Sequence, residues 1–439
     1  MRTRTLGAAA FVAVALLASA GSGQSKGPLP LTLRPAAVTN PPLGIAFGRL
    51  DTTLARLDPR TLLPRGGSVA LERFTGASSF SPDRRQLVFG SAYSVSDSPA
   101  ALRVFDVATL RPVRDLVLGP KAEIQVLDWI APDRLLAVFR SCCPAASSVS
   151  LLDPADGTVL ARDSVEGDFV AAGRARGALV LLLQPANLGP VHLAVAGADG
   201  NLRTVALDRI LGGFTATPFP GVESAGLAVD PGGGRAYVVA ANAPIGDVDL
   251  ATLGVSYHTL ARPVSLLGRL HDWLEPRAEA KEPRVSSARS ALWLGDGRIA
   301  VFGYDATGLV QNGRLEVQTR PSGLTVIDTR FWISQMLDSR SNWAIVARDA
   351  LLSTGSSWDS GTQGEIGSGL RVYGRDGRQR LHLFGKRLIG PLEVFGARAF
   401  VHRSSPESDY QIVNLTTGRI LRTVHRDLPL ILRGAGSGY

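Results

Sequence analysis

The amino-acid sequence predicts an all-β protein that folds as a single β-propeller of four-stranded antiparallel blades. Three observations lead to this prediction. A degenerate repeat returns about every 47 residues, and a second strand–turn–strand unit lies between its copies. Short runs of Val, Leu, Ile and Ala flank the turn residues of both units. A strand repeat of this period is typical of a propeller, in which each repeat supplies one blade.

The main repeat is an apolar run that ends in an Asp- or Asn-containing turn and is followed by a second short apolar run. The clear copies are centred on Asp58, Asp106, Asp153, Asp249, Asp328 and Asn414, and weaker copies on Asp199 and Asp376. Short Asp and Asn side chains accept hydrogen bonds from the backbone of a tight turn. Each copy therefore predicts two antiparallel strands, which we name C and D.

The second unit is a strand, a turn rich in Pro, Asp and Gly, and another strand. Its copies are Phe80–Phe89, Ile130–Val138, Val229–Val239 and Leu294–Val301. Pro pre-sets the first turn angle and Gly takes a positive φ, so both residue types indicate a hairpin turn. These hairpins supply strands A and B, which complete a four-stranded blade.

The number of blades follows from laying these sets end to end. Seven sets fit between residues 71 and 425, and residues 44–66 resemble strands B, C and D without strand A. Residues 428–432, at the other end of the chain, are apolar and fit the missing strand. We therefore expect eight blades, slightly favoured over seven, with the two termini closing one blade and removing its free edge.

The N-terminus has the pattern of an export signal. Arg2 and Arg4 precede the apolar run Leu6–Leu17, and Ala18-Ser19-Ala20 fits a cleavage site. We expect a signal peptide over 1–20, a flexible lead-in over 21–43, and the propeller over 44–434. The predicted location is outside the cytoplasm, in the cell envelope or secreted, with no membrane span after cleavage.

The net charge of +9 does not by itself predict an anionic partner. Nearly all of the 47 basic residues are Arg, a skew that GC-rich bacterial genomes produce, and they are scattered along the chain. Basic residues are not interleaved with aromatic ones, so we expect no specific nucleic-acid binding. We expect a monomer.

Long connections are predicted on one face of the ring. In an antiparallel blade, the B–C and D–A connections lie at the end opposite the A–B and C–D turns. The long B–C connections are 91–101, 141–148, 303–323, 354–368 and 402–410, and a long D–A insert covers 261–289. Apolar residues of this insert recur at helical spacing, so it predicts a short amphipathic helix. Long loops on a rigid scaffold are where binding usually takes place, so this B–C/D–A face is the candidate functional face.

The candidate binding residues lie in these connections. They are Tyr93, Cys142, Cys143, His271, Asp272, Trp273, Asp305, Trp358, Asp359, His402 and Arg403. In an oxidising compartment the adjacent cysteines form a vicinal disulfide, a loop staple, or stay as two thiols. Acidic and His residues together are the types that hold a metal or act as a general base, whereas solvated polar loops have the same composition. Without a second Cys pair, a zinc site is not predicted, and neither a catalytic residue nor a cofactor can be assigned.

The repeats resemble those of known bacterial propellers. Thr325-Val326-Ile327-Asp328-Thr329 resembles the YVTN-type repeat, and Ser150–Leu160 resembles the repeat of pyrroloquinoline-quinone-type propellers. Phe80-Ser81-Pro82-Asp83 is similar to the start of TolB- and WD40-like repeats. The resemblance covers about 44–434 and implies the fold, because these motifs are structural.

The quinoprotein resemblance also implies an enzymatic alternative. Quinoprotein alcohol dehydrogenases are eight-bladed and carry a vicinal disulfide beside the quinone, which Cys142-Cys143 would match. Their repeats carry a Trp in each blade, whereas Leu160 stands at that position here. Ligands for a quinone or for calcium can therefore not be placed.

Two functions remain open on the sequence. The favoured one is an exported, non-catalytic propeller that binds a protein, peptide or glycan through its B–C/D–A face. The alternative is a propeller enzyme, either a quinoprotein-like oxidoreductase or a hydrolase or lyase that uses loop acids. The familiar metalloprotease, phosphate-binding and EF-hand motifs are not found in the sequence.

Overall fold

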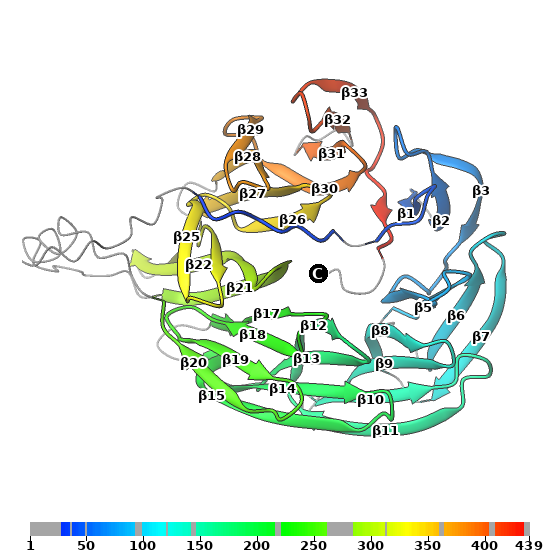
Figure 1. Ribbon diagram of the computed structural model, residues 1–439. Coiled ribbons are helices and arrows are strands. Elements are labelled where there is room, and N and C mark those ends of the chain that lie inside the picture. Colours follow the sequence, from blue (N-terminus) through cyan, green and yellow to red (C-terminus); the bar gives the residue numbers. More distant parts are fainter. Residues whose placement is uncertain are drawn as a thin grey trace, which may run out of the picture.

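The structure is a computed structural model that describes residues 28–35, 37–48, 51–92, 99–119, 122–141, 146–215, 221–260, 284–311, 314–359, 364–403 and 409–433. Within these residues the chain forms strands and turns but no helix. The strands surround a central axis, with β8, β12, β17 and β30 near the centre and β7, β11 and β33 at the rim (Figure 1). Over the same residues, no apolar helix of membrane-spanning length occurs.

Five of the sheets are separate, four-stranded and antiparallel, as expected for propeller blades. They consist of β1 (Leu43–Phe47), β2 (Thr52–Leu57), β3 (Pro64–Ala70) and β34 (Leu430–Ile431); β4 (Ser78–Phe80), β5 (Gln86–Gly90), β6 (Ala100–Asp106) and β7 (Pro112–Gly119); β8 (Glu123–Ala131), β9 (Arg134–Ser141), β10 (Ala146–Leu152) and β11 (Val159–Glu166); β17 (Gly226–Val229), β18 (Arg235–Val239), β19 (Ile245–Asp249) and β20 (Val255–His258); and β30 (Ile389–Phe395), β31 (Arg398–Arg403), β32 (Tyr410–Asn414) and β33 (Ile420–Val424).

The expected ring of seven or eight separate blades is wrong. Beyond the five separate blades, the strands form one continuous 14-stranded sheet, which we call the fused sheet. Its strands are β12 (Asp168–Ala175), β13 (Ala178–Gln184), β14 (Gly189–Gly197), β15 (Leu202–Thr215), β16 (Gly221–Ser224), β21 (Arg284–Gly295), β22 (Arg298–Gln311), β23 (Arg314–Pro321), β24 (Leu324–Asp328), β25 (Ile333–Asp338), β26 (Trp343–Ala347), β27 (Ala350–Asp359), β28 (Gly364–Gly374) and β29 (Gln379–Leu383).

Groups of strands are joined into the fused sheet because two segments that were expected to be loops form extended hairpins instead. Residues 303–323 continue as the β22–β23 hairpin, and residues 354–368 continue as the β27–β28 hairpin. The two hairpins pair with each other, with Thr319 opposite Trp358. On the other side, β16 pairs with β15 and, in parallel, with β21. The unpaired backbone groups of the extended strands are thereby satisfied by a neighbouring group of strands.

The helix expected in the insert 261–289 is not found in the part that the structure describes. Residues 284–289 belong to strand β21, and residues 261–283 lie outside the described residues.

The repeat turns share one backbone geometry. Asp58 Oδ1 accepts hydrogen bonds from the N–H groups of Arg60 (2.7 Å) and Thr61 (3.1 Å). Four residues after Asp58, Leu62 has a φ of 56° and donates its N–H to the Asp58 carbonyl at 2.7 Å. A left-handed residue stands at the same position, four residues on, in five other turns, and its N–H donates to the carbonyl of the first residue. The turns begin at Asp106, Asp153, Asp249, Asp328 and Asn414, and the left-handed residues are Leu110, Gly157, Leu253, Trp332 and Gly418 respectively. The repeat is therefore a fixed turn between strands C and D.

The two ends of the propeller meet in one blade, as predicted. Strand β34 pairs with β1, with Gly44 opposite Ile431 and Ile45 opposite Leu430. A Cβ on Gly44 would lie 2.4 Å from the Leu57 side chain and 2.7 Å from the Leu430 carbonyl, so the close approach requires glycine. Ile431 is 1% exposed and packs in the core of this blade.

The closing strand gives a direct stability prediction. We expect Ile431→Ala to lower the free energy of unfolding by about 2–5 kcal/mol, because it leaves a cavity in a fully packed core. Urea unfolding followed by circular dichroism measures this change. The matched control is Leu421→Ala, whose side chain is 49% exposed and should change stability by less than about 0.5 kcal/mol. Equal effects of the two substitutions would contradict a closing role for β34.

Candidate functional site

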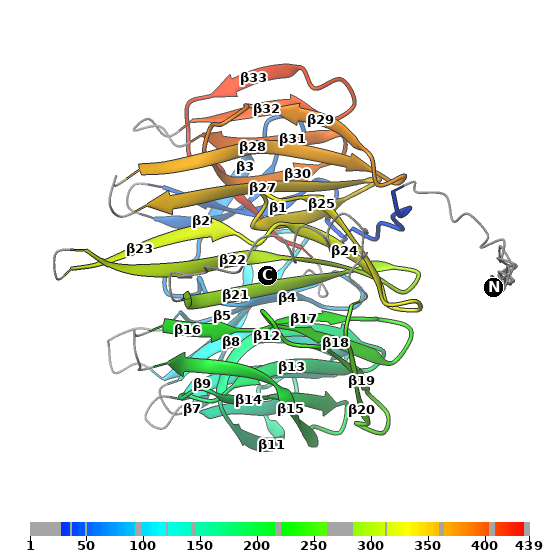
Figure 2. The same cartoon turned by 90° about the vertical axis from the view of Figure 1, so that its left-hand side faces the viewer.

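The structure describes part of the predicted binding set. Tyr93, Cys142, Cys143, His271, Asp272 and Trp273 lie outside the described residues, so their roles stay predictions. Asp305 lies on β22, Trp358 and Asp359 end β27, and His402 and Arg403 end β31. These strand ends belong to the B–C side of the ring, from which the β22–β23 hairpin projects on the left of Figure 2.

The fused sheet brings the backbones of Asp305 and Trp358 into one sheet, with their side chains on opposite sides of it. Asp305 is opposite Arg320 on β23, and Thr319 of the same strand is opposite Trp358. The Trp358 N–H also donates to the Thr319 hydroxyl at 3.2 Å. His402 lies in a different blade, beside Gly390, so it does not join them.

Asp305 is held by an arginine rather than presented to a ligand. Its two carboxylate oxygens lie 2.8 and 3.0 Å from one terminal nitrogen of Arg289. The other terminal nitrogen of Arg289 donates to the carbonyls of Ala288 and Tyr304, at 3.0 and 2.8 Å. This pair links β21 to β22, and it makes Asp305 a structural residue at the base of the hairpin.

The register of the fused sheet separates a polar side from an apolar one. Residues opposite each other in neighbouring strands point to the same side, and successive residues alternate. One side carries a line of paired residues across four strands: Glu223, Ser287, Asp305 and Arg320. Ser287 is 1% exposed and its hydroxyl donates to Glu223, whereas Arg320 at the end of this line is exposed.

The opposite side of the fused sheet carries exposed apolar side chains. Phe214 is opposite Val222, and the same side continues through Ala288 to Tyr304 and through Thr319 to Trp358. We call Phe214, Val222, Tyr304 and Trp358 the apolar row. Their exposed fractions are 45%, 42%, 41% and 39%, so each of these large apolar side chains keeps about two-fifths of its surface in contact with solvent.

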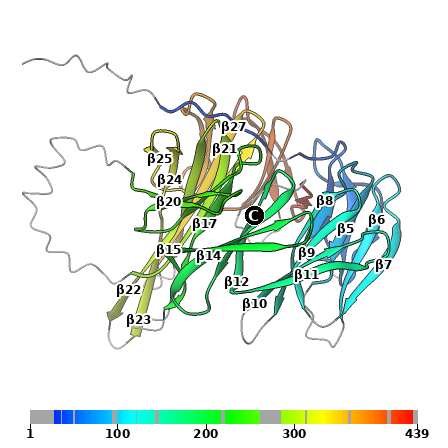
Figure 3. The same cartoon turned by 60° about the horizontal axis from the view of Figure 1, so that its bottom comes forward.

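The apolar row extends at one end. Leu188 is 45% exposed and its N–H donates to the Phe214 carbonyl at 2.9 Å. Figure 3 shows the extended strands of this region projecting on the side away from the N-terminal segment. The row therefore belongs to the B–C/D–A face that the sequence singled out.

Sequence reasoning found Trp358 but missed the rest of the apolar row. Leu315-Glu316-Val317-Gln318 alternates apolar and polar residues, which is the signal of a half-exposed strand. That signal marks residues 303–323 as strands. The side on which Tyr304 lies depends on pairing with distant strands, which the local pattern does not contain.

A small cavity opens on the same face, near the centre of the ring. Its volume is about 380 Å³, and Trp343, Gly355, Gly390, Glu393 and Leu430 are among its lining residues. Glu393 is ion-paired with Arg433, and burial raises the pKa of its carboxyl group while that arginine opposes the rise. This acid therefore fixes the closing strand to β30.

Asp128 on β8 is the other strongly perturbed acid of the inner strands. Burial raises its pKa to about 6, and Arg174 of β12, at 3.6 Å, lowers it by less. Its side chain is 2% exposed, and neither carboxylate oxygen has a hydrogen-bond partner among the described residues. A perturbed pKa marks catalytic candidates, but a substrate has no access to this group. Over the described residues, no group of three or more His, Cys, Asp or Glu is placed to hold a metal ion.

Comparisons with known proteins agree with the architecture. No protein-family model and no curated protein sequence matches the chain. Among solved structures, it is similar to the dihydro-heme d1 dehydrogenase NirN in complex with DHE, at 15% identity and a TM-score of 0.51, over 94% of this chain and 79% of that one. It is also similar to BamB from Moraxella catarrhalis (11% identity, TM-score 0.41, 85% and 97% covered) and to the Dos1 propeller (10%, 0.43, 82% and 90%). The protein is a β-propeller. At these identities the similarity shows the fold alone.

The pKa of Asp128 gives a pH-dependent prediction for this propeller. Since its pKa is raised from 3.8 to about 6 on folding, the folded state binds more protons between these values, and stability from this group falls as pH rises through that window. In Asp128→Asn this fall is absent. We expect the stability of the variant relative to the wild type to increase by up to about 3 kcal/mol between pH 4 and pH 7.

Urea unfolding of both proteins at several pH values measures this difference. The substitution itself also changes stability by an amount that does not depend on pH. This amount cancels when the difference between variant and wild type at one pH is compared with the difference at another pH. A difference that does not change with pH would show that the carboxyl group is not perturbed by burial.

Proposed function

We propose that this chain is an exported, non-catalytic β-propeller that binds a protein partner through the apolar row of its fused sheet. One observation carries the proposal. Phe214, Val222, Tyr304 and Trp358 come from four different strands, lie on one side of the sheet, and stay about two-fifths exposed. Large apolar side chains that stay exposed together on one side of a sheet are candidates for an interaction site.

The residue types favour a protein over a glycan. Trp and Tyr are enriched among the anchors of protein interfaces, where they fill apolar pockets of the partner. Val222, Phe214 and the neighbouring Leu188 present no side-chain hydrogen-bonding group. Glycan hydroxyls placed against them would lose their hydrogen bonds to water without replacement, which costs free energy.

The location of the partner follows from the N-terminal pattern. Arg2, Arg4, the apolar run Leu6–Leu17 and Ala18-Ser19-Ala20 support export with cleavage near Ala20. A bacterial source is supported by the Arg-rich composition. The partner would then be met in the cell envelope or outside the cell.

The absence of catalysis is proposed from the surroundings of three described acids. Asp305 is bound by Arg289 and Glu393 by Arg433, and Asp128 is buried. Among the described residues, no arrangement favours the quinoprotein-like or hydrolase and lyase alternatives over binding.

A photo-crosslinking experiment tests the proposed face. A photoreactive amino acid replaces Trp358 in one strain and Phe331 in a control strain. Phe331 is 70% exposed in the β24–β25 turn, on the opposite face of the ring. We expect a specific protein to be crosslinked from position 358 and not from position 331.

Binding of the purified partner then supplies the decisive measurement. We expect Trp358→Ala to weaken binding by about 30-fold or more in calorimetry, as for an interface anchor, and Phe331→Ala to leave it unchanged. Crosslinks only to glycan, or only to a second copy of this chain, would replace the proposed partner. A partner whose affinity is unaffected by Trp358→Ala and by Phe214→Ser would refute the apolar row as its site.

A further inference from the structure

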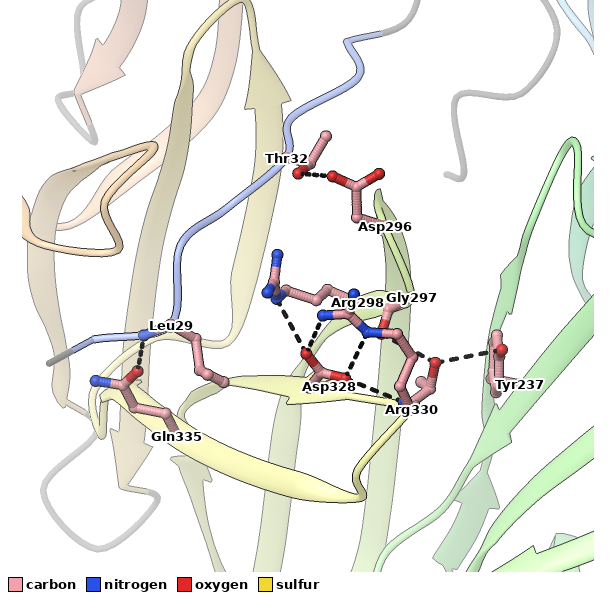
Figure 4. A network of polar contacts seen from close by, with 10 residues as sticks. Leu29, Thr32, Tyr237, Asp296, Gly297, Arg298, Asp328, Arg330 and Gln335 are labelled. Carbon is pink, nitrogen blue, oxygen red and sulfur yellow. Dashed lines mark hydrogen bonds and ion pairs between the residues drawn. The ribbon is translucent and has the colours of Figure 1, made fainter. Parts of the chain in front are cut away.

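A second surface lies on the other side of the ring, where residues 28–35 run as an extended segment across the turns of the fused sheet (Figure 4). We call these residues the strap. In the sequence 28–33 they read Pro-Leu-Pro-Leu-Thr-Leu. The strap forms no β-ladder with the sheet, so it is attached by side chains and by single hydrogen bonds.

The strap buries alternate leucines in the fused sheet. Leu31 is 3% exposed and Leu33 is 7% exposed. They pack in one apolar cluster, with the partly buried Leu29 beside them. Other members of this cluster are Leu294, Phe302, Leu324, Val326, Leu351 and Tyr373. These residues come from β21, β22, β24, β27 and β28, and we use the name strap groove for the part of this cluster against which the strap leucines pack.

Polar contacts fix the direction of the strap in the groove. The Leu29 N–H donates to the Gln335 side-chain oxygen at 2.6 Å, and the Leu31 N–H donates to the Arg375 carbonyl at 2.5 Å. The Thr32 hydroxyl donates to Asp296 Oδ2 at 2.5 Å. Backbone hydrogen bonds with pockets for alternate side chains are how proteins bind extended peptides.

Two turns of the fused sheet have a glycine where the strap backbone passes close to them. Gly377 has a φ of +72°, and a Cβ there would lie 2.5 Å from the Leu29 carbonyl oxygen. Gly295 has a φ of +101°, and a Cβ there would lie 3.1 Å from the Thr32 carbonyl oxygen. Both glycines allow the peptide to approach more closely than a side chain would permit.

The groove wall is held in place without the strap. Asp328 accepts from Arg330 at 2.6 Å and lies 3.4 Å from Arg298, which joins the β24 end to the start of β22. The Thr329 hydroxyl bonds to the Gly297 carbonyl at 2.9 Å, next to Asp296. These contacts, drawn in Figure 4, position Asp296 through residues of the ring itself.

We propose that the strap groove is a peptide-binding site that the chain fills with its own strap. Its ligand class is an extended peptide with leucines at alternate positions and a hydroxyl residue between the last two. The prolines at 28 and 30 restrict the free segment, which lowers the entropy cost of binding. The site is independent of the apolar row, which lies on the opposite face.

The test uses the full chain, cut after it has folded. A protease recognition sequence is inserted directly after Pro35, and the purified protein is cleaved and separated from the released segment. A fluorescein-labelled peptide of residues 28–35 is then titrated into the cut ring. We expect saturable binding of one peptide per ring by fluorescence anisotropy, and no binding to the uncut protein, whose groove is filled.

Matched variants identify the groove as the site. The peptide with Leu31→Ala should bind at least about 30-fold more weakly, the cost of removing a buried leucine side chain. In the ring, Asp296→Ala should weaken binding by about 5-fold, the loss of one hydrogen bond, and Phe331→Ala should not change it.

Three outcomes would overturn the proposal. A cut ring that keeps its circular dichroism spectrum but does not bind the peptide has no exchangeable site. A cut ring that unfolds when the segment leaves shows that the strap is part of the core. Equal binding of the peptide to cut and uncut protein would place its site elsewhere.

Discussion

The structure depends on one turn, in which a side-chain oxygen accepts two backbone N–H groups and the residue four positions later is left-handed. Asp58 with Leu62 and Asp249 with Leu253 are clear examples. A left-handed leucine is unfavourable by itself, so the hydrogen bonds to the Asp carboxylate and carbonyl must compensate for it. Because the turn has a fixed length, it sets which residues of strands C and D face each other. The blade core follows from this register.

The sequence predicted this turn well, since the whole interaction lies within five residues. It also predicted that residues 428–432 close the ring, because a missing strand A left only one candidate. The fused sheet was not predicted. Thr319 and Trp358 are opposite each other although 39 residues separate them, and nothing local in either hairpin specifies that pairing.

For the candidate site too, the sequence predicts one part and not the other. The face that carries Asp305 and Trp358 could be inferred from the length of the connections. The role of Asp305 could not, because its partner Arg289 is on another strand and takes both carboxylate oxygens. The apolar row likewise results from register: Tyr304 and Asp305 are neighbours in sequence but point to opposite sides of the sheet.

Both faces of the ring meet the same physical problem at the fused sheet. Neighbouring groups of strands leave apolar side chains and backbone groups uncovered where they diverge. On one face the strap covers them, with Leu31 and Leu33 buried. On the other face the extended strands cover one another's backbone but leave Phe214 and Trp358 partly exposed. We place the partner on the apolar row because its side chains stay exposed, whereas the strap covers the opposite face of the ring.

The central claim is that the apolar row is covered by a protein in the native setting. Hydroxyl-radical footprinting of the protein in its own cell envelope, compared with the purified protein, measures this for each side chain. The account predicts that Phe214, Tyr304 and Trp358 are protected from oxidation in the envelope, while Phe331 on the opposite face is oxidised equally in both samples. Equal oxidation of the apolar row in both samples, or protection at Phe331 alone, would contradict it.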